Sequence, residues 1–244
     1  MKVVVVGGSG LVGSQVIELL RSQGHEAVSA SPSSGVNTLT GEGVAEVLTG
    51  ADAVVDVTNS PSFADQDVLD FFTTSTGVLL KAEQEAGVRH HVAVSIVGAD
   101  RIPDSGYMRA KVAQEELISS GPVPYSIVRA TQFFEFAPGI VGMSTDATGV
   151  VRAPSAFIQP IASSEVSRIV VEVVTAEPKN GHLDIAGPER FGLDEFLRLG
   201  VPGTDIVTDP EATYGGGRLQ QDSLVPTGPA ILSEITLADW QATR

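Results

Sequence analysis

Glycines spaced three residues apart follow directly on a run of valines at the start of the chain. Val3–Val6 is short, apolar and β-branched, which is typical of a buried strand. Gly7, Gly10 and Gly13 form the pattern GxxGxxG, and apolar side chains then recur at helical spacing from Val12 to Leu20. A loop of this kind turns tightly, lets a pyrophosphate approach the backbone, and offers it the N–H groups of a helix N-terminus. The pattern predicts a dinucleotide-binding loop, and a purely structural turn is the alternative.

Similar apolar runs recur through the first half of the chain, with helical patterns between them. Runs that are continuous rather than alternating favour parallel strands with helices on both faces. The expected strands are Val3–Val6, Glu26–Ala30, Ala53–Val57, Val92–Val97 and Tyr125–Val128. The expected helices are the one that follows the glycine loop and stops near Gly24, then Gly43–Thr49, Gln66–Glu85 and Tyr107–Ser119. This order predicts an α/β fold with a doubly wound parallel sheet.

The second half of the chain has shorter elements separated by prolines. The pattern predicts a helix at Glu165–Thr175, a strand at Leu183–Ile185 and a short helix at Leu193–Leu199. We therefore expect residues 1–132 to form the dinucleotide-binding core. Residues 133–244 should add the last core elements and a small C-terminal cap that binds the substrate, with Trp240 anchoring the tail.

Charge and composition exclude several classes of protein. The 30 acidic and 15 basic side chains give a net charge of −15, which disfavours nucleic acids and anionic membranes as partners. With no cysteine, the chain has no disulfide and no thiolate metal site. No apolar stretch is long enough for a signal peptide or a membrane span, so we expect a soluble cytoplasmic protein. His90 and His91 lack metal-site spacing to the other histidines and are interpreted as the polar start of a strand; no metal is expected.

The end of the second strand bears on the choice of cofactor. An NAD site usually has a carboxylate here that binds the ribose 2′-hydroxyl, whereas residues 29–34 contain none. The hydroxyls of Ser31, Ser33 and Ser34 can instead donate to a 2′-phosphate, although no Arg or Lys accompanies them. The segment favours NADP. The alternatives are NAD, or a solvated loop that binds neither phosphate nor ribose.

A serine, a tyrosine and a lysine follow in order. Ser95 lies near the end of a predicted strand, where ligands bind in sheets of this kind. Tyr107 and Lys111 are four residues apart near a helix start and share one face. A neighbouring ammonium lowers a phenol pKa from about 10 toward neutrality, so the pair can supply a general acid while Ser95 orients a carbonyl.

Together these segments resemble an atypical short-chain dehydrogenase/reductase, closest to the NmrA-like NAD(P)H-binding group that includes bacterial quinone reductases. The resemblance rests on the glycine loop, Ser95, Tyr107–Lys111 and Val128–Phe134, and it extends to Ile185–Glu189, Ser223–Pro226 and Asp239–Trp240. It implies a Rossmann-like fold, with Tyr107 as acid and Lys111 on the nicotinamide ribose. The cofactor-binding residues it implies are Gly7, Ser9, Gly10, Leu11, Val12, Gly13, Ser31, Ser33, Ser34, Val57, Thr58, Asn59, Lys111, Ala130, Thr131 and Phe133.

Three functions remain open at this point. The first is an NADP-dependent reductase of a small carbonyl compound or quinone, with Tyr107, Lys111 and Ser95 as catalytic residues. The second is a non-catalytic NADP redox sensor, since several NmrA-like proteins act in this way and have lost the tyrosine. The third is an epimerase or dehydratase that retains its cofactor. The best-known short-chain enzymes add an Asn in the preceding helix, and Gln66–Glu85 has none. Substrate identity and oligomeric state are not determined by these patterns.

Two further groups have alternative interpretations. Asp52 and Asp56 flank a predicted strand, and we interpret one as a turn residue and the other as a strand-end group beside the cofactor. Phe133, Phe134 and Phe136 follow the last predicted strand of the core. They form either an apolar wall for the substrate or part of the hydrophobic core.

Overall fold

A sheet of seven parallel strands forms the centre of the computed structural model, which describes residues 1–243. The strand order is β13-β8-β5-β4-β3-β1-β2. The strands are β1 (Lys2–Val6), β2 (Glu26–Ala30), β3 (Ala53–Asp56), β4 (His90–Ile96), β5 (Tyr125–Ala130), β8 (Gly181–Ala186) and β13 (Ala230–Leu232). The predicted doubly wound α/β fold is confirmed, and each strand predicted from the sequence lies within about two residues of an observed one.

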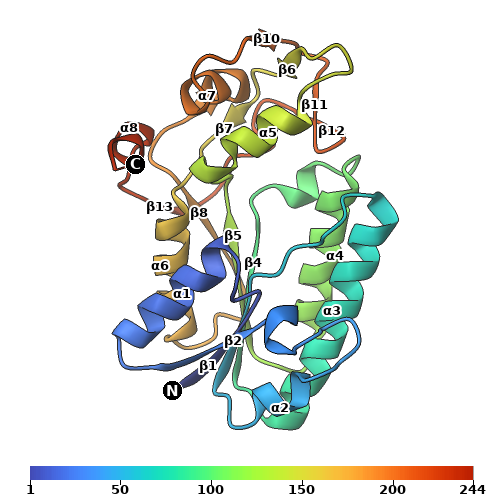
Figure 1. Cartoon of the computed structure of the whole chain (residues 1–244), viewed down its shortest axis with the longest axis vertical. Helices are drawn as coiled ribbons and strands as arrows, with labels where there is room; N and C mark the ends of the chain where they lie inside the picture. The colour runs from blue at the N-terminus through green and yellow to red at the C-terminus, as the bar shows by residue number, and fades with distance from the viewer. Residues whose placement is uncertain (244) are drawn as a thin grey trace.

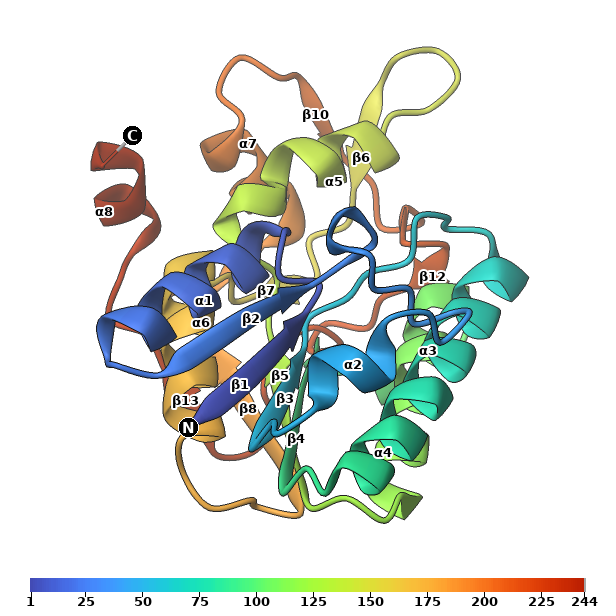
Figure 2. The ribbon, with the colours of Figure 1, turned by 60° about the horizontal axis from the view of Figure 1, so that its bottom comes forward.

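Helices cover both faces of this sheet. On one face lie α1 (Leu11–Ser22) and α6 (Ser163–Val174), and on the other lie α2 (Val44–Leu48), α3 (Asp65–Ala86) and α4 (Gly106–Ser120). Figure 1 shows the two helical layers on either side of the strands, and Figure 2 shows the same layers from below. The sheet is therefore buried on both faces.

The valine run explains why β1 lies in the middle of the molecule. Val3 and Val5 pack into the hydrophobic cluster under α1 and α6, whereas Val4 and Val6 pack into the cluster under α2, α3 and α4. Successive side chains of a strand point to opposite faces, so a strand buried on both faces needs an apolar residue at every position. A fully buried valine contributes about 1.5–3 kcal/mol relative to an exposed one.

The connections from β1 place a crevice at the carboxyl edge of the sheet. β1 pairs with β2 on one side and with β3 on the other, so the chain reverses its direction of travel across the sheet at this strand. Ligands of open α/β sheets bind outside the carboxyl ends of the strands at such a reversal. The glycine loop lies at this position, between β1 and α1.

The second half of the chain contributes β8, β13 and α6 to the sheet layers and builds a separate layer above the carboxyl edge. A third hydrophobic cluster, centred on Phe134, Phe196 and Leu197, holds this upper layer together. Trp240 packs against Phe134 with ring centroids 5.4 Å apart, so the tail is anchored as expected. The upper layer contains α5 (Ala137–Met143), β6 (Val151–Ala153), β7 (Phe157–Ile158), β9 (Phe191–Gly192), α7 (Leu193–Gly200), β10 (Ile206–Thr208), β11 (Thr213–Tyr214), β12 (Gly217–Arg218) and α8 (Leu237–Ala242).

The two adjacent histidines start β4, as the sequence predicts, and both are buried. His91 Nδ1 lies 2.9 Å from the Glu83 carboxylate on α3, and His90 Nε2 lies 2.9 Å from Ser126 Oγ on β5. Each imidazole enters the interior because a neighbouring element supplies a polar partner.

Two features of the described residues concern metal ions and membranes. Within residues 1–243, no group of three or more His, Asp or Glu side chains is placed to hold a metal ion. In the same part of the chain, none of the helices combines the length and the apolar character that crossing a membrane requires.

The buried His91–Glu83 pair makes stability depend on pH. Burial lowers the pKa of His91, but the charge and hydrogen bond of Glu83, helped by Asp56, outweigh it and raise that pKa above 6.5. A group with a raised folded-state pKa stabilises the fold below its unfolded pKa, and this contribution is lost as pH rises through the folded pKa. We expect the free energy of unfolding to fall as pH increases above about 6.5.

Glu83→Gln should lower the free energy of unfolding by about 3 kcal/mol at neutral pH and weaken this pH dependence, because it removes one partner of a buried pair. Urea denaturation followed by circular dichroism across this pH range measures both effects. Glu85→Gln, at an exposed position on the same helix, is the matched control. Equal stabilities and pH profiles for the two variants would contradict the prediction.

Candidate functional site

A cavity of about 700 Å³ opens at the carboxyl edge of the sheet, between the glycine loop and helix α5 of the upper layer. Its walls come from the glycine loop, the segment after β3, the ends of β4 and β5, the start of α4, helix α5 and the end of β11. Most of the residues predicted from the sequence line this one space. They are Gly10, Leu11, Val12, Gly13, Val57, Thr58, Asn59, Ser95, Tyr107, Lys111, Ala130, Thr131 and Phe133.

The glycine loop leaves no room for side chains at several of its positions, Gly7 and Gly13 among them. Gly7 has a positive φ of 81°, and a Cβ there would lie 2.8 Å from the carbonyl oxygen of Val57. A Cβ on Gly13 would lie 2.3 Å from the carbonyl oxygen of Gly7. Gly10 is the N-cap of α1 and provides no side chain to cap it. The first N–H groups of α1 are therefore available to a ligand, as a phosphate site requires.

The serine segment lies beside this loop but does not line the cavity. The backbone N–H of Gly7 donates to the carbonyl of Ala30 at 2.9 Å, which brings the end of β2 against the loop. Ser31 Oγ and Ser33 Oγ are 2.9 Å apart, and Ser34 Oγ accepts from the backbone N–H of Ser31 at 3.0 Å. Ser34 thus stabilises the turn itself, whereas the exposed Ser33 hydroxyl faces solvent next to the loop.

The segment after β3 is held by a buried carboxylate. Asp56 Oδ1 accepts from the backbone N–H of Thr58 at 3.0 Å and from its hydroxyl at 2.7 Å. This turn places Asn59 in the wall of the cavity. There, Asn59 Oδ1 accepts a hydrogen bond from the Tyr107 hydroxyl at 2.7 Å. Asp56 is thus the strand-end group beside the cavity, while Asp52 accepts from the backbone N–H of Lys2 at the opposite edge of the sheet.

Ser95, Tyr107 and Lys111 all line the cavity, as their order in the sequence predicted. Ser95 Oγ is buried and has no hydrogen-bond partner among the described residues. An unpartnered buried hydroxyl costs about 1–3 kcal/mol, which a ligand oxygen can recover. Tyr107 lies in the first turn of α4, and Lys111 lies one turn later and is buried.

Lys111 does not act on Tyr107 as expected. Its Nζ donates to the carbonyl of Val94 at 3.0 Å and to Gln114 Oε1, and it lies 4.4 Å above the centre of the Phe72 ring. Burial raises the pKa of Tyr107 above 10, and the nearby Tyr214 raises it further. The expected lowering of the Tyr107 pKa toward neutrality is therefore wrong, because the ammonium is directed at the sheet.

Lys111 belongs to a buried polar chain that the sequence did not reveal. Gln114 accepts from Lys111 and donates to Asp56 Oδ2 at 3.0 Å, linking α4 to the end of β3. Burial lowers the pKa of Lys111 to about 8, although Asp56 and Glu115 oppose this shift. The only sequence signal for Gln114 was its position three residues after Lys111, on the same helix face.

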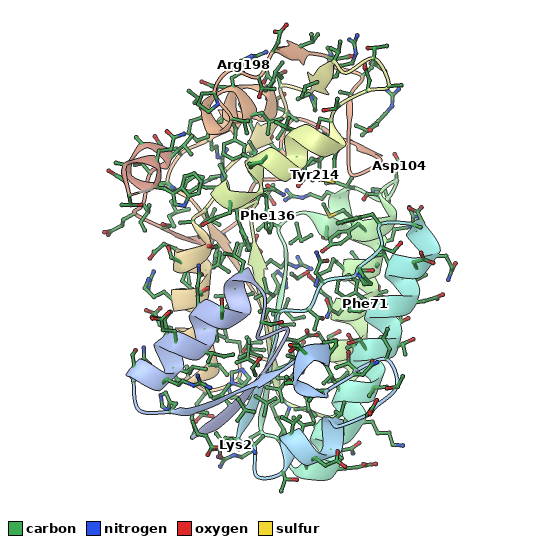
Figure 3. All side chains as sticks on the ribbon, in the orientation of Figure 1. Lys2, Phe71, Asp104, Phe136, Arg198 and Tyr214 are labelled. Atoms are coloured by element: carbon green, nitrogen blue, oxygen red, sulfur yellow. The ribbon has the colours of Figure 1, made fainter. Side chains whose placement is uncertain are left out.

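The three phenylalanines after β5 divide between the two alternatives. Phe133 and Phe136 line the cavity and stack with ring centroids 4.6 Å apart. Phe134 is buried in the core of the upper layer instead. Tyr214 and Gln132 are among the cavity residues that the sequence did not indicate, and Tyr214 comes from a distant part of the chain. Figure 3 shows Phe136 and Tyr214 below α5, on the side that faces the sheet.

These features fit a dinucleotide. The glycine loop has the close backbone approach and free helix N-terminus that a pyrophosphate needs, and Ser95 supplies an unsatisfied hydroxyl farther along the same cavity. The loop would hold the pyrophosphate, Val57–Asn59 would line the cleft, and Ala130, Thr131 and Phe133 would flank the nicotinamide.

Comparison with curated proteins finds a relative that is not described as an enzyme. The chain is 26% identical over 224 residues to the photosystem II assembly factor Ycf39 of Synechocystis. The match covers 82% of this chain and 66% of the relative, so it spans slightly less than two thirds of that protein.

Solved structures and a family model place the chain among cofactor-binding proteins. The UDP-glucose 4-epimerase of Thermus thermophilus in complex with NAD is 17% identical with a TM-score of 0.70, covering 100% of this chain and 93% of that one. The NADPH-dependent quinone oxidoreductase QOR2 of Escherichia coli is 16% identical with a TM-score of 0.64, covering 85% and 77%. A family model described as NAD(P)H-binding matches residues 7–177. The chain therefore belongs to this NAD(P)H-binding family.

Proposed function

We propose that the protein is an NADPH-dependent oxidoreductase that reduces a small carbonyl compound or a quinone. The observation that carries the proposal is the position of the Tyr107 hydroxyl. It lies 2.7 Å from Asn59 Oδ1, in the same cavity that the glycine loop lines. A proton donor and a dinucleotide loop at one cavity suit the transfer of a hydride and a proton to one substrate.

When bound, a reduced nicotinamide supplies the hydride, and the substrate gains this hydride and one proton. The Tyr107 phenol gives up its hydrogen bond to Asn59 and donates that proton to the substrate oxygen as negative charge develops on it. Because its pKa is above 10, Tyr107 stays protonated throughout the neutral range. The buried Ser95 hydroxyl donates a second hydrogen bond to the same oxygen and orients it.

Lys111 has a positioning role in this proposal. Its ammonium holds Gln114, which in turn holds the Asp56 carboxylate at the end of β3. Two of its three N–H donors are used by Val94 and Gln114, so the third would remain for a nicotinamide ribose hydroxyl while the amine stays charged. Because burial lowers the pKa of Lys111 to about 8, this interaction weakens in alkaline solution.

NADPH is the proposed form of the cofactor because of the segment after β2. It contains no carboxylate that would repel a 2′-phosphate, and the Ser33 hydroxyl is exposed beside the glycine loop. The adjoining Ser31 hydroxyl, 2.9 Å away, can donate to the same group.

A non-catalytic NADPH sensor is the second candidate. The raised pKa of Tyr107 and the orientation of Lys111 toward the sheet both favour it, since neither activates the phenol. The curated relative Ycf39 is described as an assembly factor, which is consistent with a role through protein partners. This candidate predicts cofactor binding without oxidation of the cofactor.

Tyr107→Phe should lower kcat about 100-fold or more, because it removes the proton donor. The dissociation constant for NADPH should stay the same. The decrease of NADPH absorbance with a panel of quinones, ketones and aldehydes measures turnover, and isothermal titration calorimetry measures binding. Tyr125→Phe, which loses the same hydroxyl at the far end of β5, is the matched control. Unchanged turnover in Tyr107→Phe would overturn the acid assignment, and NADPH binding without turnover in the wild type would favour the sensor.

Ser33→Asp should weaken NADPH binding about tenfold or more and leave NADH binding nearly unchanged, because the new carboxylate repels only the 2′-phosphate. Calorimetric titration with both cofactors measures this difference. The control is Ser22→Asp, which adds the same charge at an exposed position at the end of α1. Equal weakening of both cofactors would show that residues 31–34 do not recognise the phosphate.

A further inference from the structure

Tyr214 reaches the cavity from a hairpin near the C-terminal end of the chain. Thr213–Tyr214 pairs antiparallel with Gly217–Arg218, with Tyr214 opposite Gly217. The turn between them is Gly215–Gly216, with φ of 54° and 82°, as a tight two-residue hairpin turn requires. The Ser105 hydroxyl donates to the carbonyl of Gly215 at 2.7 Å, so the hairpin is anchored to the start of α4.

The Tyr214 hydroxyl has a defined hydrogen-bonding direction. The Gln132 side-chain amide donates a hydrogen bond to the phenol oxygen, while burial raises the pKa of Tyr214 to about 12. The hydroxyl is therefore protonated at neutral pH and accepts through its oxygen. A phenol in this state still has its own proton to donate. Gln132 Oε1 is buried and has no hydrogen-bond partner among residues 1–243.

The cavity that the Tyr107 and Tyr214 phenols share is lined by aromatic and aliphatic side chains. Phe133 and Phe136 stack 4.6 Å apart on one wall, and Ile140 and Met143 of α5 continue it. Tyr107 and Tyr214 pack against the same hydrophobic cluster and are near enough for a charge on Tyr214 to affect Tyr107. The cavity thus combines aromatic walls with two separate phenolic donors.

Building on the reductase proposed above, we propose that Tyr214 is a second hydrogen-bonding site for the substrate, oriented by Gln132. Tyr107 donates its proton to one oxygen of the substrate, and Tyr214 donates a hydrogen bond to a second oxygen on the same ring. For a quinone, the hydride and this one proton together give the hydroquinone. The favoured substrate class is then a flat ring compound with two oxygen atoms, such as a quinone, rather than one with a single carbonyl. Tyr214 determines specificity, and Gln132 is a positioning residue.

Turnover tests the proposal with two substrates of similar size, 1,4-benzoquinone and benzaldehyde. Tyr214→Phe should lower kcat/KM about tenfold for benzoquinone and leave benzaldehyde unchanged, since one hydrogen bond to the second oxygen is lost. Gln132→Met should give a smaller loss in the same direction, and Tyr125→Phe should change neither substrate. The chain has no cysteine that benzoquinone could modify.

Binding provides a second readout that needs no turnover. Hydroquinone and phenol differ by one hydroxyl, and calorimetric titration of the NADP-loaded protein measures their affinities. The wild type should prefer hydroquinone, and Tyr214→Phe should abolish that preference without weakening phenol binding. A loss of packing alone would weaken both probes, so this comparison separates recognition from structure.

The two readouts distinguish failure of this proposal from failure of the reductase. If the wild type turns over both substrates and Tyr214→Phe affects them equally, the second site is overturned and the reductase stands. If nothing is turned over but Tyr214→Phe abolishes the preference for hydroquinone, the second site is supported and the reductase is overturned. Equal binding of hydroquinone and phenol by the wild type also overturns the second site.

Discussion

The close approach of the glycine loop to β3 is the constraint on which the rest of the site depends. At Gly7 and Gly13 a side chain would collide with backbone, and because glycine has none, the loop can pack tightly between the end of β1 and the start of α1. This packing brings the helix N-terminus to the point where the sheet changes direction. The segment Val57–Asn59 lies against the loop for the same reason and carries Asn59 to Tyr107. One backbone contact therefore joins the predicted cofactor site to the predicted proton donor.

Polar groups buried beside the apolar sheet occur in linked sets. Lys111, Gln114 and Asp56 join α4 to β3 below the cavity, and His91 joins Glu83 between β4 and α3. A buried charge is costly unless it is paired and hydrogen-bonded, so each group restricts the position of the element that carries its partner. Burial also explains the direction of the pKa shifts, since it favours the neutral form of both Tyr107 and Lys111. The cavity thus contains a fully protonated phenol and a lysine that is readily deprotonated.

Local patterns predicted the elements of the sheet layers well. Valine runs mark strands buried on both faces, and Glu26–Ala30 was predicted at the bounds it has. Errors arose where a side chain meets a partner distant in sequence. The pairing of His91 with Glu83 on α3 was not predicted, because nothing near His91 in the sequence indicates it. Lys111 was expected to act on Tyr107 because the contact between Gln114 and Asp56 was not predicted either. The alternatives for Phe133, Phe134 and Phe136 were separated only by the packing of the upper layer.

The sequence by itself determined the α/β class, the glycine loop and the order of Ser95, Tyr107 and Lys111, because these depend on residue type and short-range spacing. The tertiary structure decided which of these side chains share a cavity, which way Lys111 points, and that Tyr214 joins them. Tyr214 comes from a hairpin more than a hundred residues after Tyr107, and it is held there by hydrophobic packing and by the hydrogen bond from Ser105 to Gly215. Contacts of this kind are set by the packing of whole layers, for which no local pattern of residues exists.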